Sequence, residues 1–239
     1  MDLVATDPAV VAHDLQQPLP FEAESFAVVY HSHVLEHLPR ERALPFLKEC
    51  YRVLKAKEGI LRVAVPDLER QAALYLENLQ SALAGDPLGQ ERYEWMTVEL
   101  IDQLARQHAD GGEMFKYLCR DPIPGLEFVI QRLGYEITSK LDTIRTCVRD
   151  GLTTQYIDEL RAAATPEKIG QYRTSGEVHL WMYDRYSLGR LLAAAGFGGI
   201  TTQAPAASFI PGFERYHLDT LEDGSVRKPD SLFMEARKF

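Results

Sequence analysis

The stretch FAVVYHSHVLEH, residues 26–37, decides how the chain is interpreted. It opens with five apolar residues, 26–30, a run typical of a strand that is buried on both faces. Three histidines and a glutamate follow within the next seven positions. Polar groups that directly follow a buried parallel strand lie where open α/β sheets bind ligands. The stretch therefore predicts a strand followed by a ligand-binding loop.

A second strand follows after one helix. Leu44, Leu47, Tyr51 and Leu54 recur at helical spacing, and Gly59 ends that pattern. The next residues, 60–65, read ILRVAV and form a second buried apolar run that a proline stops. Strand, helix and strand in direct succession predict a βαβ unit with parallel strands and a right-handed crossover.

The sequence pattern changes from α/β to mostly helical after residue 66, and it returns to α/β after residue 183. Residues 67–183 carry long amphipathic stretches, at 68–83, 91–107 and 151–164, which predict a mostly helical insertion. This insertion is either a packing cap or a lid over a pocket. The last part returns to α/β, with Asp184 capping a helix and two closing strands at 199–203 and 232–236. We therefore expect an α/β domain made of residues 1–66 and 184–239, interrupted by the helical insertion.

Composition narrows the class of protein. The formal net charge is −9 and no run of lysine and arginine is long, so nucleic acid is not expected as a partner. No stretch of about 18 apolar residues predicts a membrane span. The three scattered cysteines and the acidic start, with no signal peptide, indicate a cytoplasmic protein with free thiols. Composition leaves the oligomeric state open.

The five residues HVLEH, 33–37, also match the H-x-x-E-H pattern of inverted zinc peptidases. Such a site needs both histidines on one helix face. A helix has little room here, because a strand ends just before His33 and Pro39 follows closely. A zinc hydrolase is therefore the outside alternative. We expect His33 and His37 to hydrogen-bond the loop backbone, and His31 and Ser32 to face the ligand crevice.

A longer stretch carries a family resemblance. Residues 13–69, HDLQQPLPFEAESFAVVYHSHVLEHLPRERALPFLKECYRVLKAKEGILRVAVPDLE, resemble the class I S-adenosylmethionine-dependent methyltransferases, in the subset often called type 11. Residues 181–239 are similar to the end of that fold more loosely. The resemblance implies a doubly wound, mostly parallel, Rossmann-like sheet with strand order 3-2-1-4-5-7-6. The two apolar runs at 26–30 and 60–65 would be its strands four and five.

The resemblance also implies residues that bind S-adenosylmethionine. In the family, an acid closing strand two bonds the ribose hydroxyls, and Asp2 holds that place. An acid after strand three contacts the adenine amine, which Asp14, followed by Leu15, matches. The loop after strand four passes the methionine end of the cofactor, and the residues that match it are Tyr30, His31 and Ser32.

The implied reaction moves a methyl group from the sulfonium to a nucleophile, so positioning supplies most of the catalysis. A base is needed only for an acceptor that carries a proton of high pKa. His31 or Asp67 would serve, since each lies at the carboxyl end of a predicted strand. Asp67 has a second interpretation as a helix cap. The acidic composition favours a small-molecule or saccharide-type acceptor.

One family feature is missing. The family binds the cofactor over a Gly-rich turn after strand one, and this chain has no such motif. The chain begins near the family's strand two, so we expect a Rossmann-like fold that lacks its first strand. Residues upstream, a degenerate relative and a rearranged sheet are three competing explanations. We expect weak or absent cofactor binding, and a non-catalytic binding or scaffold module is the alternative function.

Overall fold

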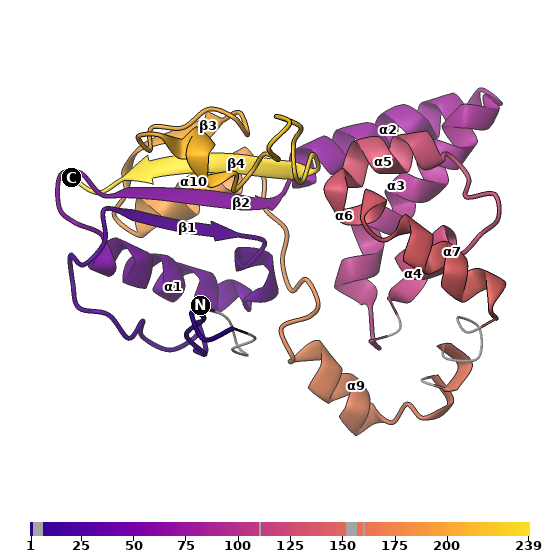
Figure 1. The fold of residues 1–239 in the computed structure, drawn as a ribbon, viewed down its shortest axis with the longest axis horizontal. Helices are drawn as coiled ribbons and strands as arrows, with labels where there is room; N and C mark the ends of the chain where they lie inside the picture. The colour runs from indigo at the N-terminus through magenta and orange to yellow at the C-terminus, as the bar shows by residue number, and fades with distance from the viewer. Residues whose placement is uncertain (2–6, 110, 152–156, 160) are drawn as a thin grey trace. The chain divides into compact units, whose positions relative to one another are not determined.

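The computed structural model describes residues 1, 7–109, 111–151, 157–159 and 161–239. The chain folds into two compact units, drawn in Figure 1. The first, called the sheet unit, contains residues 1–66, 180–217 and 231–239. The second, called the helical unit, contains residues 67–179 and 218–230. The segment 218–230 therefore leaves the C-terminal α/β part of the sequence and joins the helical unit.

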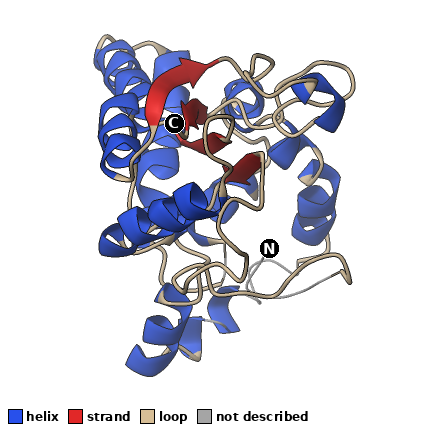
Figure 2. Ribbon diagram, turned by 90° about the vertical axis from the view of Figure 1, so that its left-hand side faces the viewer, coloured by secondary structure: helices blue, strands red, loops and turns tan. Residues whose placement is uncertain are grey.

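The sheet unit is built on four strands whose spatial order is β1-β2-β4-β3. Strands β1 and β2 pair in parallel, and β4 pairs antiparallel with both β2 and β3. Figure 2 shows these strands in red. Their bounds are β1 Val28–Ser32, β2 Ile60–Pro66, β3 Gly198–Gln203 and β4 Ser231–Arg237.

The parallel pair confirms the predicted βαβ unit. Helix α1, Arg40–Val53, connects β1 to β2. The spatial order also agrees with the last four strands, 4-5-7-6, of the family sheet. The expectation of a mostly parallel sheet is wrong for the described strands, since two of their three pairings are antiparallel. Residues 204–230 join β3 to β4 without a crossover helix, and such a return places a strand antiparallel to its neighbour.

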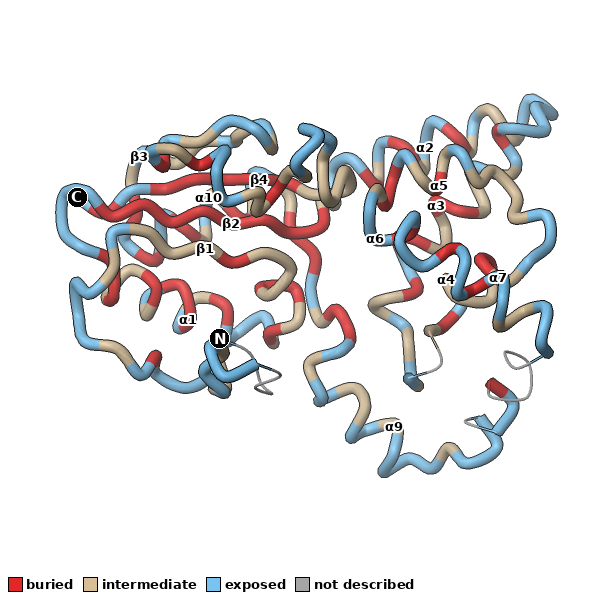
Figure 3. Tube along the Cα trace, in the orientation of Figure 1, coloured by how far each residue is buried: buried red, intermediate tan, exposed pale blue. Residues whose placement is uncertain are grey.

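The helices of the sheet unit cover one face of the sheet. Alternate β2 residues, Leu61, Val63 and Val65, pack in one core with side chains of α1 and α10, Arg185–Ala194. Asp184 caps α10 as predicted, and it forms a capping box with Ser187. Two-sided helical cover, expected of a doubly wound sheet, is not seen within the described residues of this unit. Strand β2 itself is buried along its whole length, as Figure 3 shows.

The opposite face of the sheet holds a buried ion pair. Arg62 on β2 and Glu235 on β4 are both fully buried, and their side chains meet at 2.8 Å. The guanidinium also donates to the carbonyls of Ala204, Pro205 and Ala207, and it lies 4.3 Å from the centre of the Phe213 ring. The Arg62 guanidinium therefore holds the loop after β3 against the sheet. This loop includes the 3-10 helix η2, Phe213–Tyr216.

The helical unit has its own core around Trp95 and Tyr117, whose rings meet edge to face at 5.2 Å. The predicted helix over 68–83 is confirmed, and 91–107 lies mostly in α3. The predicted stretch 151–164 falls partly outside the described residues. No helix in the described parts of the chain is long and apolar enough to cross a membrane. The helices are α2 Leu68–Leu83, α3 Pro87–Ala105, α4 Gly112–Leu118, α5 Leu126–Leu133, α6 Tyr135–Thr138, α7 Leu141–Arg149 and α9 Pro166–Arg173.

We predict that removing one partner of the buried ion pair destabilises the protein strongly. Glu235→Leu should lower the free energy of unfolding by about 3–5 kcal/mol, because Arg62 is left charged in the interior. The double variant Arg62→Met/Glu235→Leu should recover part of that loss. Urea unfolding followed by circular dichroism measures both changes.

A surface pair in the same unit is the control. Glu24 is 56% exposed and lies 3.7 Å from the Lys238 ammonium, so Glu24→Gln should cost less than about 1 kcal/mol. Equal losses for Glu235→Leu and Glu24→Gln would show that the buried pair does not hold the sheet unit together.

Candidate functional site

The candidate site lies at one edge of the sheet, where three strands meet. The backbone N–H of His33, just after β1, donates to the carbonyl of Ala64 on β2 at 2.9 Å. Ser231, the first residue of β4, lies opposite Pro66, the last residue of β2. The carboxyl ends of the parallel strands and the amino end of β4 therefore share one edge. Open α/β sheets place ligands at this kind of edge.

His33 is the centre of the site. Its Nε2 lies 2.8 Å from the Ser231 hydroxyl, and its Nδ1 lies 3.2 Å from Oε1 of Glu36. The backbone of His33 has a φ of 53°, a left-handed conformation that costs a non-glycine residue about 1–2 kcal/mol. We expected His33 to hydrogen-bond the loop backbone. That expectation is wrong, since the ring hydrogen-bonds the Ser231 hydroxyl and contacts the Glu36 carboxylate. Strain of this kind collects at functional sites.

Glu36 is completely buried, in the short 3-10 helix η1, Leu35–His37. Its backbone carbonyl accepts hydrogen bonds from the N–H groups of Leu180 (2.7 Å) and Trp181 (3.2 Å). The ring Nε2 of His37 lies 4.0 Å from the carboxylate. The 3-10 turn confirms that no regular helix carries His33 and His37 together, which is the geometry that the zinc interpretation requires.

Tyr183 marks the electrostatic surroundings of Glu36. Its hydroxyl is buried and finds no hydrogen-bond partner among the described residues. Burial, together with the nearby Glu36 carboxylate and against the opposing effect of Arg40, raises the pKa of Tyr183 to about 12. The phenol therefore stays protonated at neutral pH and remains a hydrogen-bond donor within the site.

His31 is buried on the helix side of the sheet. Its ring meets the Phe46 ring edge to face at 5.3 Å, and neither ring nitrogen has a hydrogen-bond partner among the described residues. Desolvation lowers the pKa of His31 from 6.5 to about 4, although the nearby Glu36 opposes the shift. The imidazole is therefore neutral at pH 7. Its burial weighs against the predicted role of a base that meets a substrate, and the cofactor contact stays a prediction.

The predicted adenine and ribose contacts come from the N-terminal residues. Asp2 lies outside the described residues. Asp14 is half-buried, and one of its carboxylate oxygens accepts the backbone N–H of Gln16 at 2.9 Å. Leu15 packs against the core of the sheet unit. The ribose and adenine roles of these residues stay predictions.

The other predicted residues follow the strands. Tyr30 and Ser32 are half-buried on β1, and alternation along the strand places them on the face opposite to His31. Asp67 caps α2, because its carboxylate accepts the N–H of Arg70 at 3.1 Å. Burial raises the pKa of Asp67, and this cap is the structural role that the sequence also predicted.

The comparisons with known proteins bear on this edge of the sheet. Residues 3–63 match the methyltransferase domain family. The methyltransferase-domain segment includes Asp14, β1, η1 and α1, and it ends within β2. Most of the candidate site therefore lies in the matched part, whereas Ser231 and Tyr183 lie outside it. The comparison with curated proteins found no match, and neither did the comparison with solved structures.

Sequence reasoning missed Ser231 and the contact between Glu36 and His33. Ser231 follows His33 by 198 positions, and no motif surrounds it. The H-x-x-E-H pattern did contain a signal for Glu36, because its spacing places an acid three residues after a histidine. The pattern suggested a metal site only as the outside alternative, and in the structure Glu36 Oε1 instead lies 3.2 Å from Nδ1 of His33.

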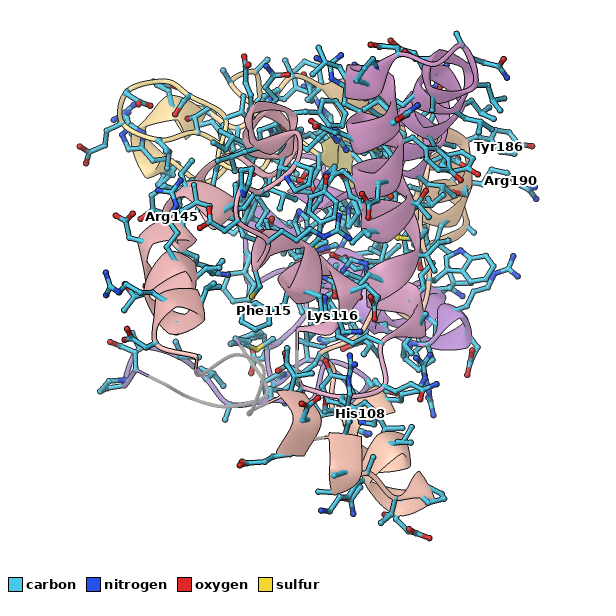
Figure 4. All side chains as sticks on the ribbon, turned by 90° about the vertical axis from the view of Figure 1, so that its right-hand side faces the viewer. His108, Phe115, Lys116, Arg145, Tyr186 and Arg190 are labelled. Carbon is cyan, nitrogen blue, oxygen red and sulfur yellow. The ribbon has the colours of Figure 1, made fainter. Side chains whose placement is uncertain are left out.

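The helical unit has a separate cavity of about 440 Å³. Val98, Ile101 and Ala105 of α3 form an apolar wall. Charged side chains complete the lining, and His108 and Lys116, labelled in Figure 4, belong to it. An apolar wall beside charged groups suits a small molecule with both apolar and ionic parts.

We predict that His31 makes the stability of the protein depend on pH. The unfolded state binds a proton near pH 6.5, whereas the folded state resists it down to about pH 4. Stability is therefore lost as the pH falls through this window, by about 2 kcal/mol between pH 7 and pH 5. His31→Leu should remove this part of the pH dependence. Urea unfolding at both pH values tests it, and equal slopes for the two proteins would contradict the assignment.

Proposed function

We propose that this chain carries an S-adenosylmethionine-dependent methyltransferase fold that acts on a small-molecule or saccharide-type acceptor. The observation that carries the proposal is the match of residues 3–63 to a methyltransferase domain. The strand order β1-β2-β4-β3 supports it, since it agrees with the second half of the family sheet. The proposal requires a Rossmann-like sheet, and the four strands β1-β2-β4-β3 form a part of it.

Among the described residues, groups suited to the adenine end of the cofactor are present, and a turn suited to its methionine end is not. Asp14 offers a half-buried carboxylate to the adenine amine, and its Oδ2 lies 3.5 Å from the Gln17 amide, at the limit of a hydrogen bond. The methionine end needs a turn whose backbone is not shielded by side chains. The glycines at 196, 198 and 199 do not serve instead, because these residues connect α10 to β3 and do not follow a strand. We therefore assign no catalytic step to the cofactor and propose that it binds weakly.

The acceptor class rests on charge and on the cavity. A net charge of −9 opposes a polyanionic substrate such as nucleic acid. The cavity of the helical unit, about 440 Å³, lies within the size range of small-molecule sites. We propose that the acceptor is a small molecule for these two reasons.

A binding or scaffold module is the second candidate function, because the described residues fit only part of the cofactor. A chain that keeps the methyltransferase fold without its cofactor loop would act as a binding or scaffold module. The two functions differ in one measurable property, because only the first requires the chain to bind a sulfonium nucleotide or its product.

A titration with S-adenosylhomocysteine tests the proposal. We expect weak binding, which Asp14→Asn should weaken about tenfold or more, because the carboxylate accepts a hydrogen bond that the amide accepts less well. Asp7→Asn is the matched control, since Asp7 is exposed and accepts the N–H of Ala9 at 2.8 Å, as Asp14 accepts that of Gln16. Ligand-observed NMR measures weak binding of this kind.

Each contrary outcome has a distinct meaning. Tight binding of S-adenosylhomocysteine would show that the Gly-rich turn is dispensable and that the cofactor is held by other residues. Equal binding by wild type and Asp14→Asn would remove Asp14 from the adenine site. No binding at millimolar ligand would overturn the cofactor assignment and favour the scaffold function.

A further inference from the structure

We propose that Ser231 is a nucleophilic hydroxyl, that His33 is its base and that Glu36 is the residue that positions His33. The site would accept an acyl or phosphonyl group from a small ester or a comparable donor with a weakly basic leaving group. This activity needs no sulfonium cofactor. It is therefore independent of the proposed methyl transfer, and either can fail without the other.

The contacts form an unbroken chain. The Ser231 hydroxyl lies 2.8 Å from Nε2 of His33, and Nδ1 of the same ring lies 3.2 Å from Oε1 of Glu36. Oε1 of Glu36 is in electrostatic contact with Nδ1, without the geometry of a hydrogen bond. The proposal places the ring proton on Nδ1, because an ionised carboxylate attracts a donor and repels a lone pair. The Nε2 is then the acceptor that faces Ser231. A nucleophile next to a base, and the base next to an orienting acid, is the arrangement that recurs on unrelated folds.

Glu36 is more deeply buried than the two residues that follow it in this chain of contacts. Glu36 has no exposed side-chain surface, His33 is 14% exposed, and Ser231 is half-buried. The orienting acid is therefore shielded from water, where its attraction for the ring proton is strongest. The proposal requires that a small reagent reaches the hydroxyl at the other end. A purely structural ion pair, such as Arg62 with Glu235, is closed at both ends instead.

The three residues are held by regular structure. His33 is fixed by its backbone hydrogen bond to Ala64, Glu36 by two hydrogen bonds to its carbonyl, and Ser231 by its place in β4. Figure 1 shows β1, β2 and β4 side by side in this sheet. Groups on rigid elements keep the geometry that a reaction requires. The left-handed backbone of His33 is the conformation that turns its ring toward both partners.

The proposed reaction has two halves, acyl transfer to Ser231 and hydrolysis of the acyl-serine. The Ser231 oxygen attacks the carbonyl carbon, the new O–C bond forms, and the hydroxyl proton passes to Nε2 of His33. The bond from the carbonyl carbon to the leaving oxygen then breaks, and the leaving group takes that proton. Water attacks the acyl-serine in the second half by the same route, which releases the acid and restores the hydroxyl.

A fluorophosphonate probe tests the nucleophile on the full-length protein. Its phosphorus bonds to the serine oxygen, fluoride leaves, and the proton passes to the histidine. Intact-mass and peptide mass spectrometry should show one adduct, on Ser231. Ser231→Ala should abolish it, and His33→Gln should slow it about 100-fold or more, within the usual contribution of a general base. Ser25→Ala is the control, because Ser25 is exposed and donates only to the carbonyl of Glu22.

A second variant separates catalysis from folding. Ser231→Cys places a thiol beside His33, and iodoacetamide at pH 6 should alkylate it at least about tenfold faster than the half-buried Cys119 and Cys147 of the same molecule. His33→Gln or Glu36→Gln, added to this variant, should remove the advantage, and Glu36→Asp should restore part of it. A merely structural role would not produce this pattern.

The outcomes that overturn the proposal are definite. They are no fluorophosphonate adduct on folded wild type, an adduct on another serine, or an unchanged rate in His33→Gln. An introduced thiol that reacts no faster than Cys119 overturns it too, even where Ser231→Ala fails to fold.

Discussion

The structure of the sheet unit depends on the two-sided pairing of β2. This strand pairs in parallel with β1 on one side and antiparallel with β4 on the other, and every one of its residues is buried. Because the two partners run in opposite directions, the end of β1 and the start of β4 meet at the same edge. A residue near position 33 and a residue near position 231 thus become neighbours without any local sequence relation.

Two buried carboxylates occupy this unit in different ways. Glu235 pairs with Arg62 and accepts hydrogen bonds from Ser208 and from the N–H of Phe209, so the charge is enclosed by partners that all belong to the fold. Glu36 instead lies against the imidazole of His33, which is itself partly exposed. A buried carboxylate whose partner can take up and release a proton is chemically versatile, whereas one held by a guanidinium is fixed.

The histidine cluster shows where sequence reasoning reached its limit. Alternation along a strand places successive residues on opposite faces, but the sequence does not say which face a helix will cover. Helix α1 covers the face of His31, so that ring packs on Phe46 and burial lowers its pKa to about 4. His33 lies beyond the strand end, where the left-handed backbone turns its ring toward Glu36 and Ser231. The local pattern therefore predicted polar residues at the end of β1, and packing decided which histidine ring contacts Glu36 and Ser231.

By itself, the sequence determined the βαβ unit, the capped helix after Asp184 and the helix over 68–83. It also determined the family resemblance that the methyltransferase-domain match supports. Each of these features depends on local periodicity or on a contiguous motif. Only the tertiary structure decided the antiparallel place of β4, the division of the C-terminal part between two units, the Arg62 ion pair and the partnership of His33 with Ser231. These features join residues far apart in the chain. Their energies arise from burial and hydrogen bonding that exist only once the strands are side by side.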